Sequence, residues 1–198
     1  MQLIIFGDRT AAEMKAVADE VCGHQFDRIQ TCVVDANLVG FENYCRDLKS
    51  AQIEIRYLIG LIDMQIRRRI EKACQQLSLE PWKLIHPQAY IAPSAQISPG
   101  CFVAPQASIG INAVIGDHSI IHFGASVGHD AQLGRHCAVL PGARISGNVC
   151  LGEGVLVGSN AFIFQGTQIG DEAKIDALTY VKEDVPKRRI VSVRRSGA

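Results

Sequence analysis

IAPSAQ-ISPGCF-VAPQAS-IGINAV, residues 91–114, opens a run of hexads that continues to VKEDVP at residues 181–186. The first position is Ile, Val or Leu in all sixteen hexads, and the fifth is always Ala, Cys, Ser, Thr or Val. An apolar stripe of period six does not fit a helix, whose faces recur about every 3.6 residues. It fits short strands joined by tight turns, three of which close a coil of about eighteen residues. The array therefore predicts a stack of triangular coils that share an aliphatic core.

The residues before the array predict a small parallel α/β sheet. Apolar runs at 2–6, 30–34, 53–59 and 82–85 indicate four strands, in the order strand, helix, strand, strand, helix, strand. Thr10 and Glu13 form a predicted capping box at the start of the first helix. For the second helix we expect one buried apolar face and one exposed basic face. The apolar face comprises Ile62, Ile66, Ile70, Ala73 and Leu77, and the basic face comprises Arg67, Arg68 and Arg69.

Composition excludes several classes of protein. The formal net charge is zero, which argues against binding to duplex nucleic acid, because such proteins need a basic footprint. We expect neither a membrane span nor a signal peptide, since there is no run of 18 apolar residues and no charged-then-apolar start. The seven cysteines form no C-x-x-C pair, and Cys101, Cys137 and Cys150 fall at core or turn positions of the hexads. They predict buried thiols in a reducing cytoplasm.

His129 and Asp130 are the strongest candidates for chemistry. Histidine titrates near neutral pH and is the usual general base, and an adjacent carboxylate can hold its tautomer. Neighbours on a strand point to opposite faces, but a turn between strands relaxes that restriction. One coil on, Gly147 stacks over His129, where a backbone N–H could stabilise an oxyanion; the alternative is that Gly147 is simply a turn residue. This combination of base and donor is what acyl transfer requires.

The remaining histidines of the array raise the question of a metal. His118 and His136 are eighteen residues apart and should stack, whereas His118 and His122 are four apart. Hexapeptide-repeat carbonic anhydrases use two histidines five residues apart on one coil, and the residue five beyond His129 is Gly134. We therefore expect no metal, and we interpret His118 and His136 as a polar surface ladder.

The carboxyl ends of the predicted N-terminal strands are a second candidate site, because ligands bind such sheets at that edge. Gly7, Asp8, Asp35 and Gly60 all lie there. The alternative is that the two glycines merely turn the chain. The first loop contains no G-x-G-x-x-G, and Asp8 would repel a diphosphate unless Arg9 points inward.

The whole chain resembles the sialic-acid O-acetyltransferase-like family, which includes bacterial N-acetyltransferases of nucleotide-linked 4-amino sugars. The motifs that carry the resemblance lie in both predicted domains. They are Asp35, Ile59-Gly60 before an R-R-I, L-I-H-P at 84–87, P-S-A at 93–95, V-x-H-D at 127–130 and the S-G-N-V pattern around Gly147. The resemblance implies an α/β Rossmann-like domain followed by an all-β left-handed parallel β-helix, assembled as a homotrimer.

It also implies domain roles: a small α/β substrate-binding domain at 1–88, a β-helix acyltransferase domain at 89–186 and a basic tail at 187–198. Carried over by position, His129 is the general base and Asp130 its companion carboxylate. Gly147, Ser159 and Ala177 match positions that line an acetyl-CoA channel between subunits. Asp35, His122 and the loops at Gly7, Asp8 and Gly60 match the acceptor pocket.

Four departures from the family leave the acceptor open. The Gly-rich first loop is replaced by Gly7-Asp8-Arg9-Thr10, a common Asn is His122, and a frequent second His is Ala138. The tail lacks the usual G-V-P-A-K, and its basic residues would either meet the CoA phosphates or be a solvated tail. These residues are Lys187, Arg188, Arg189, Arg194 and Arg195.

The leading hypothesis is a cytoplasmic, acetyl-CoA-dependent N-acetyltransferase of a nucleotide-linked amino sugar, in which the amine attacks the thioester directly. The alternatives are acyl transfer to a hydroxyl or to a non-nucleotide acceptor, and a non-catalytic trimeric scaffold.

Overall fold

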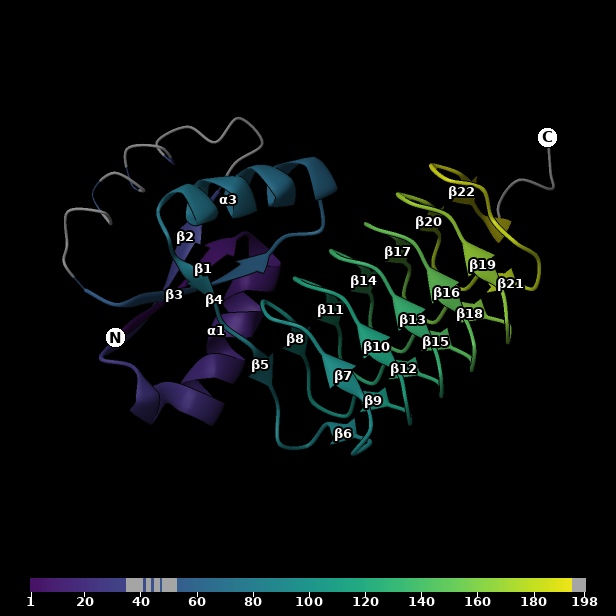
Figure 1. The fold of residues 1–198 in the computed structure, drawn as a ribbon, viewed down its shortest axis with the longest axis horizontal. Helices are drawn as coiled ribbons and strands as arrows, with labels where there is room; N and C mark the ends of the chain where they lie inside the picture. The colour runs from purple at the N-terminus through teal and green to yellow at the C-terminus, as the bar shows by residue number, and fades with distance from the viewer. Residues whose placement is uncertain (35–40, 42–43, 45–46, 48–52, 194–198) are drawn as a thin grey trace. The chain divides into compact units, whose positions relative to one another are not determined.

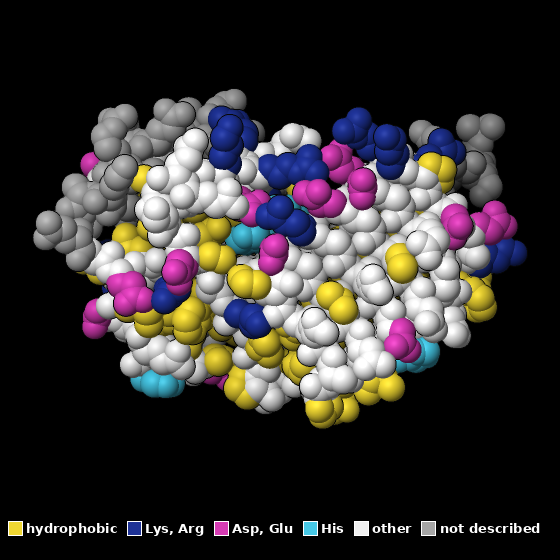
Figure 2. Space-filling model, in the orientation of Figure 1, with side chains coloured by type: hydrophobic (Ala, Val, Ile, Leu, Met, Phe, Trp, Pro, Cys, Tyr) yellow, Lys and Arg dark blue, Asp and Glu magenta, His cyan; other side chains and the backbone are white. Residues whose placement is uncertain are grey.

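The computed structural model describes residues 1–34, 41, 44, 47 and 53–193. It divides the chain into two compact units, Met1–Leu84 and Ile85–Ala198. The first is an α/β unit and the second a β-helix, as the sequence predicts (Figure 1). None of the helices in the described part of the chain has the length and apolar character needed to cross a membrane. On the face drawn in Figure 2, basic and acidic side chains are interspersed, in keeping with a net charge of zero.

The N-terminal unit is a four-stranded parallel sheet in the order β2-β1-β3-β4. Its elements are β1 (Gln2–Gly7), α1 (Arg9–Cys22), the 3-10 turn η1 (Gly23–Gln25), β2 (Arg28–Val33), β3 (Ile55–Gly60), α3 (Met64–Gln76) and β4 (Glu80–Pro81). The inner strands β1 and β3 are nearly all buried, which explains their continuous apolar runs. The predicted fourth strand at 82–85 is wrong: Glu80–Pro81 pairs with β3, and Leu84–Ile85 belongs to the β-helix.

Helices α1 and α3 differ in detail from the prediction. Asp8, not Thr10, is the N-cap of α1, and its Oδ1 accepts a hydrogen bond from the Thr10 N–H at 3.1 Å. The predicted capping box is therefore wrong, because the helix already begins at Arg9. Arg67 of α3 is fully buried and Ile62 is exposed, so the predicted basic face holds only for Arg69 and, in part, Arg68.

The β-helix has three parallel sheets of two-residue strands. The seven-stranded sheet contains β5 (Leu84–Ile85), β8 (Phe102–Val103), β11 (Ile120–Ile121), β14 (Ala138–Val139), β17 (Leu156–Val157), β20 (Lys174–Ile175) and β22 (Ile190–Val191). The six-stranded sheet contains β6 (Tyr90–Ile91), β9 (Ser108–Ile109), β12 (Ser126–Val127), β15 (Arg144–Ile145), β18 (Phe162–Ile163) and β21 (Tyr180–Val181). The five-stranded sheet contains β7 (Gln96–Ile97), β10 (Val114–Ile115), β13 (Gln132–Leu133), β16 (Cys150–Leu151) and β19 (Gln168–Ile169).

The hexad positions have distinct structural roles. The first and fifth residues form one continuous buried core, and the sixth and first residues form each strand. The fourth residue of every hexad from Gly100 to Leu178 has a positive φ, between 55° and 76°. This left-handed conformation is favoured by Gly, Asn, Asp and His, which together occupy most of these positions.

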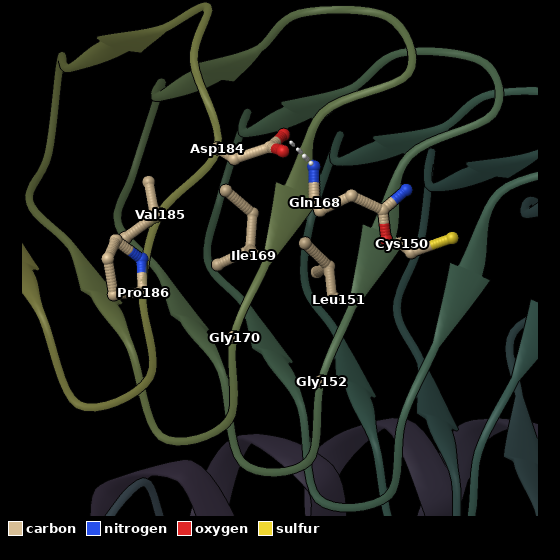
Figure 3. A pocket seen from close by; sticks show the side chains of 9 residues that line it. All are labelled: Cys150, Leu151, Gly152, Gln168, Ile169, Gly170, Asp184, Val185 and Pro186. Carbon is tan, nitrogen blue, oxygen red and sulfur yellow. Dashed lines mark hydrogen bonds between the residues drawn. The ribbon is translucent and has the colours of Figure 1, made fainter.

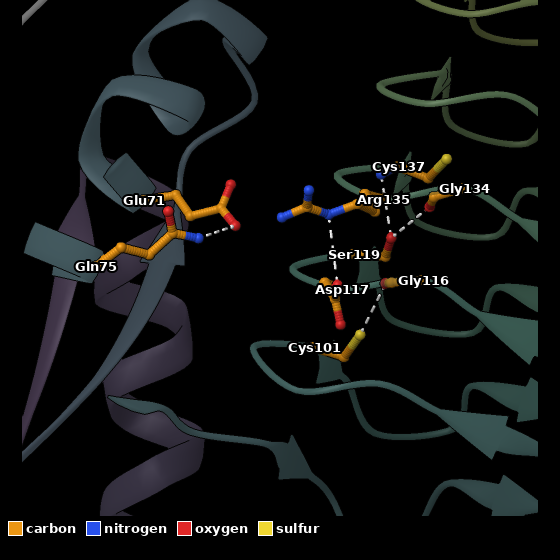
Figure 4. A network of polar contacts seen from close by, with 9 residues as sticks. All are labelled: Glu71, Gln75, Cys101, Gly116, Asp117, Ser119, Gly134, Arg135 and Cys137. Carbon is orange, nitrogen blue, oxygen red and sulfur yellow. Dashed lines mark hydrogen bonds and ion pairs between the residues drawn. The ribbon is translucent and has the colours of Figure 1, made fainter. Parts of the chain in front are cut away.

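Small polar side chains at the fifth position are satisfied inside the core. The Ser119 hydroxyl donates to the Gly134 carbonyl at 3.1 Å and accepts from the Cys137 N–H at 3.1 Å (Figure 4). The Cys101 thiol donates to the Gly116 carbonyl at 3.2 Å, as Figure 4 shows. The Cys137 thiol makes the matching bond to the Gly152 carbonyl at 3.1 Å. Cys150 differs from its predicted burial, because it lies at a sixth position and is only half-buried.

The array slips by two residues in its last coil, so the predicted unbroken register to Pro186 is wrong at its end. Val185 pairs with Ile169, and Val191 with Ile175, each sixteen residues apart instead of eighteen. Asp184 lies at the slip, and its Oδ1 accepts from the Gln168 N–H at 2.8 Å. Residues of this coil and of the coils before it line a pocket of about 440 Å³ (Figure 3). The pocket is lined by Cys150, Leu151, Gly152, Gln168, Ile169, Gly170, Asp184, Val185 and Pro186.

Candidate functional site

His129 and Asp130 lie at the turn that links β12 to β13. Asp130 occupies the left-handed fourth position, with φ at 57°, so the alternation of side chains along a strand does not separate it from His129. The Nδ1 atom of His129 is 2.8 Å from Oδ2 of Asp130. The side chains of His129 and Asp130 are 50% and 44% exposed. The pair is thus formed within one chain and stays open to a reactant.

The imidazole of His129 lies across Gly147, one coil further on. A Cβ at position 147 would come within 2.5 Å of Cε1 and closer still to Nε2, so only glycine leaves room for the ring. The backbone stacking is continuous here, because the Asn148 N–H donates to the His129 carbonyl at 2.8 Å. Gly147 is therefore a packing requirement of the His129 side chain as well as part of a turn.

Asp130 is held as a carboxylate. Its hydrogen bond to His129 lowers its pKa most, and a second bond from Asn112 adds to the effect. An ionised Asp130 beside Nδ1 favours the tautomer with the proton on Nδ1, which leaves the Nε2 lone pair free. Nε2 is the nitrogen nearest Gly147. The arrangement can take a proton from a reactant bound beside Gly147.

Ser159 and Ala177 lie at a different corner of the coil from His129. Both follow strands of the seven-stranded sheet, in the turns from β17 to β18 and from β20 to β21. His129 and Gly147 occupy turns from the six-stranded to the five-stranded sheet. Within one chain the structure does not bring Ser159 or Ala177 to His129. Ala177 lines a pocket of about 370 Å³ with Asp176, Leu178, Ser192 and Val193.

The side chain of His122 is buried and does not project into solvent. Its Nδ1 accepts from the Phe123 N–H at 3.1 Å, and its ring packs edge-on against Phe102 at 6.3 Å. It also follows a strand of the seven-stranded sheet, and therefore lies at the corner of Ser159 and Ala177.

His118 and His136 stack as predicted, with ring centroids 5.3 Å apart and planes inclined by 14°. The expected surface ladder is wrong, however, because the two residues are 3% and 2% exposed. Both occupy left-handed fourth positions, which histidine tolerates better than most residues. In the described part of the chain, no group of three or more His, Cys, Asp or Glu side chains is placed to hold a metal ion.

Gly7 and Gly60 pair at the carboxyl ends of β1 and β3. A Cβ on Gly7 would collide with the Gly60 carbonyl, and one on Gly60 would lie 2.5 Å from the Ala11 Cα. Close packing of α1 on the two strands therefore accounts for both glycines. This favours a structural role for Gly7 and Gly60 over a role in ligand binding. Asp35 lies outside the described residues.

Two acidic side chains cap the helices at this edge. Asp8 accepts from the Thr10 N–H, and Asp63 accepts from the Gln65 and Ile66 N–H groups at 2.9 and 3.0 Å. Free N–H groups at a helix N-terminus are where a phosphate normally binds. Here the chain's own carboxylates occupy that position on both α1 and α3, while Arg9 is exposed.

The basic residues after Pro186 have different environments in the structure. Arg188 has a positive φ, and its Nε is 3.0 Å from Glu172 Oε2, so it belongs to the last coil. Lys187 and Arg189 lie in the same turn and are exposed. Arg194 and Arg195 lie outside the described residues.

One polar contact of the site was not predicted from the sequence. Asn112 lies at the same hexad position as Asp130, one coil earlier, and its Nδ2 donates to Asp130 Oδ1 at 3.0 Å. The interval of eighteen residues was the signal that could have identified it.

The comparisons with known proteins support the same interpretation. Residues 112–147 match the family described as bacterial transferase hexapeptide (six repeats), and residues 148–182 match the hexapeptide repeat of succinyl-transferase. No protein among the curated sequences matches this chain.

Several solved structures are similar over nearly the whole chain. A histidine-to-asparagine mutant of perosamine N-acetyltransferase from Caulobacter crescentus, in complex with CoA and GDP-perosamine, is 25% identical with a TM-score of 0.84. The match covers 96% of this chain and 91% of that one. The acetyltransferase domain of PglB from Neisseria gonorrhoeae with acetyl coenzyme A is 25% identical, with a TM-score of 0.82 and coverage of 96% and 95%. WeeI from Acinetobacter baumannii, 17% identical with a TM-score of 0.83 and 98% coverage of both chains, shares the fold. That fold is a small α/β unit followed along the chain by a left-handed β-helix.

Proposed function

We propose that this chain, a hexapeptide-repeat acyltransferase, transfers the acetyl group of acetyl-CoA to the amino group of an amino sugar. The observation that carries the proposal is the His129–Asp130 pair, whose imidazole lies across Gly147. The similar structures support the choice of reactants, since they include an amino-sugar N-acetyltransferase with CoA and an acetyltransferase domain with acetyl-CoA.

The proposed reaction uses His129 as the general base. The amine nitrogen attacks the thioester carbonyl carbon while Nε2 of His129 takes the amine proton. Asp130 stabilises the resulting imidazolium through Nδ1. The tetrahedral oxyanion accepts a hydrogen bond from backbone N–H groups, with that of Gly147 as the candidate donor. The C–S bond then breaks, and the CoA thiolate leaves with the proton from the imidazolium, so that no acyl-enzyme forms.

We propose that the active form is a trimer in which acetyl-CoA binds between neighbouring chains. Gly147 lies at the corner of His129, but Ser159 and Ala177 lie at another corner. In the trimer that we propose, the thioester touches both sets by bridging two copies of the chain. An exposed aromatic group at the C-terminal end of the six-stranded sheet offers apolar surface for such a contact. It comprises Phe162, Phe164 and Tyr180, with Phe162 and Phe164 centroids 5.7 and 6.5 Å from that of Tyr180.

Two versions of the acceptor remain, and different observations favour each. The resemblance and the complex with GDP-perosamine favour a nucleotide-linked amino sugar. The self-capped N-termini of α1 and α3 favour an acceptor without a diphosphate, because Asp8 and Asp63 would repel phosphate oxygens. In that version the same transfer goes to the amine or hydroxyl of a sugar that carries no nucleotide.

A thiol-release assay with acetyl-CoA and a panel of amino sugars, free and linked to UDP, dTDP or GDP, tests the proposal. His129→Ala should lower turnover by about 10³-fold, because general-base catalysis contributes on that order. If only the nucleotide-linked sugars are acetylated, the acceptor is a nucleotide-linked amino sugar. If the free sugars are acetylated, the acceptor is a sugar that carries no nucleotide. Near-normal turnover by His129→Ala would exclude the mechanism.

A further inference from the structure

The carboxylate of Asp130 is held from two sides. Its Oδ2 is 2.8 Å from His129 Nδ1, and its Oδ1 accepts a hydrogen bond from Asn112 Nδ2 at 3.0 Å. Both bonds contribute to holding Asp130 in its ionised form. Asp130 is thus the middle member of a chain of three polar side chains that ends at the imidazole.

The β-helix itself places Asn112 where it can reach Asp130. The two residues occupy the same corner in successive coils, with φ angles of 56° and 57°. The backbone of Asn112 is anchored one coil earlier, since its N–H donates to the Ser94 hydroxyl at 3.0 Å. The Asp130 N–H in turn donates to the carbonyl of Ile111 at 2.9 Å. The side-chain amide is therefore presented to Asp130 by two fixed backbones.

We infer that Asn112 is a positioning residue, which orients the Asp130 carboxylate and, through it, the imidazole of His129. The inference rests on the proposed role of His129 as general base. An aspartate side chain that is 44% exposed can rotate and bond to water, which would leave Nδ1 without a fixed partner. A donor on Oδ1 removes that freedom, so Oδ2 stays at Nδ1 and Nε2 keeps its lone pair toward Gly147.

Asn148 provides a matched control. It lies at the same corner one coil after Asp130, with φ at 59°, and its side chain is exposed. Within the described residues no hydrogen bond joins its side-chain amide to Asp130, although its backbone N–H bonds to the His129 carbonyl. Glycine tolerates a positive φ, so Asn112→Gly and Asn148→Gly each remove an amide without straining the turn.

The first test is imidazole nitrogen NMR on the free protein, which reports the tautomer of His129. In the wild type and in Asn148→Gly, we expect one tautomer with the proton on Nδ1. In Asn112→Gly, we expect a mixture of both tautomers. This readout needs neither substrate nor turnover, and a change of overall stability does not produce it.

The second test is steady-state kinetics on the acceptor that the thiol-release assay identifies. Asn112→Gly should lower kcat about 10-fold, as loss of an outer-shell partner does, with KM within twofold of wild type. Asn112→Asp keeps the shape but replaces the donor with an acceptor, and should lower kcat at least as much. Asn148→Gly should stay within twofold of wild type.

Equal losses of kcat in the two glycine variants would overturn the inference, as would a single unchanged tautomer in Asn112→Gly. If His129→Ala is inactive and Asn112→Gly is fully active, the inference fails while the proposed function stands. If the wild type transfers acetyl to no amino sugar, the proposed function fails, and the tautomer comparison still decides the role of Asn112.

Discussion

The ring of His129 occupies the space that a side chain at position 147 would need, so the two residues depend on each other although eighteen positions separate them. The dependence arises because stacked coils place equivalent turn positions directly above one another. A substitution at Gly147 therefore tests how strongly catalysis depends on the position of the His129 ring.

Gly147→Ala should displace the imidazole and reduce kcat about 100-fold, since a misplacement of about 1 Å can cost that much. The methyl group would meet Cε1 at 2.5 Å, so the ring would have to move away from its present position. Acetyl-transfer kinetics with a thermal melt would measure the effect. Gly23→Ala serves as the control, because a Cβ there meets nothing within 4 Å. A fully active Gly147→Ala would mean that the ring does not need its present place.

The lowered pKa of Asp130 predicts a pH dependence of stability. Because the folded pKa lies below the ordinary value of 3.8, the bond to His129 stabilises the fold above pH 3.8. That contribution is lost as pH falls below 3.8 through the lowered pKa. In urea unfolding, wild type should therefore lose more stability than Asp130→Asn between pH 4.5 and the acid limit. Identical acid profiles for the two proteins would contradict the prediction.

Arg67 should matter for stability and Arg69 should not. Arg67 is fully buried on α3, whereas Arg69 of the same helix is exposed. Arg67→Ala should lower the free energy of unfolding by about 2–4 kcal/mol, through lost packing and disrupted buried polar contacts. Arg69→Ala should stay within about 0.5 kcal/mol of wild type. Urea denaturation measures both, and equal values for the two variants would contradict the assigned burial.

Asp184 should hold the last coil in its slipped register. Its Oδ1 satisfies the N–H of Gln168, so Asp184→Ala should cost about 0.5–1 kcal/mol and expose that amide to exchange. Hydrogen exchange at Gln168 is the direct measurement. Glu183→Ala, one residue earlier and also exposed, is the control and should leave this amide protected. Unchanged protection in Asp184→Ala would show that the slip is held by other contacts.

The fold of the β-helix was predictable because each hexad repeats the same local requirement. An aliphatic first residue and a small fifth residue recur, and only short stacked strands bury both at period six. The pair His129–Asp130 and its glycine one coil on were predictable for the same reason, since a regular array converts spacing along the chain into neighbours in space. The slip after Val181 was not, because Val185 also satisfies the fifth position of an unbroken hexad.

The sequence by itself determined the coil, its core and the column that contains His129, Asp130 and Gly147. Only the tertiary structure decided which side chains stabilise the fold. It buries Arg67, His118 and His136, uses Asp8 as a helix cap and turns the amide of Asn112 onto Asp130. The physical reason is that periodicity specifies which positions align, whereas burial and hydrogen bonding depend on what the neighbouring element offers at that point.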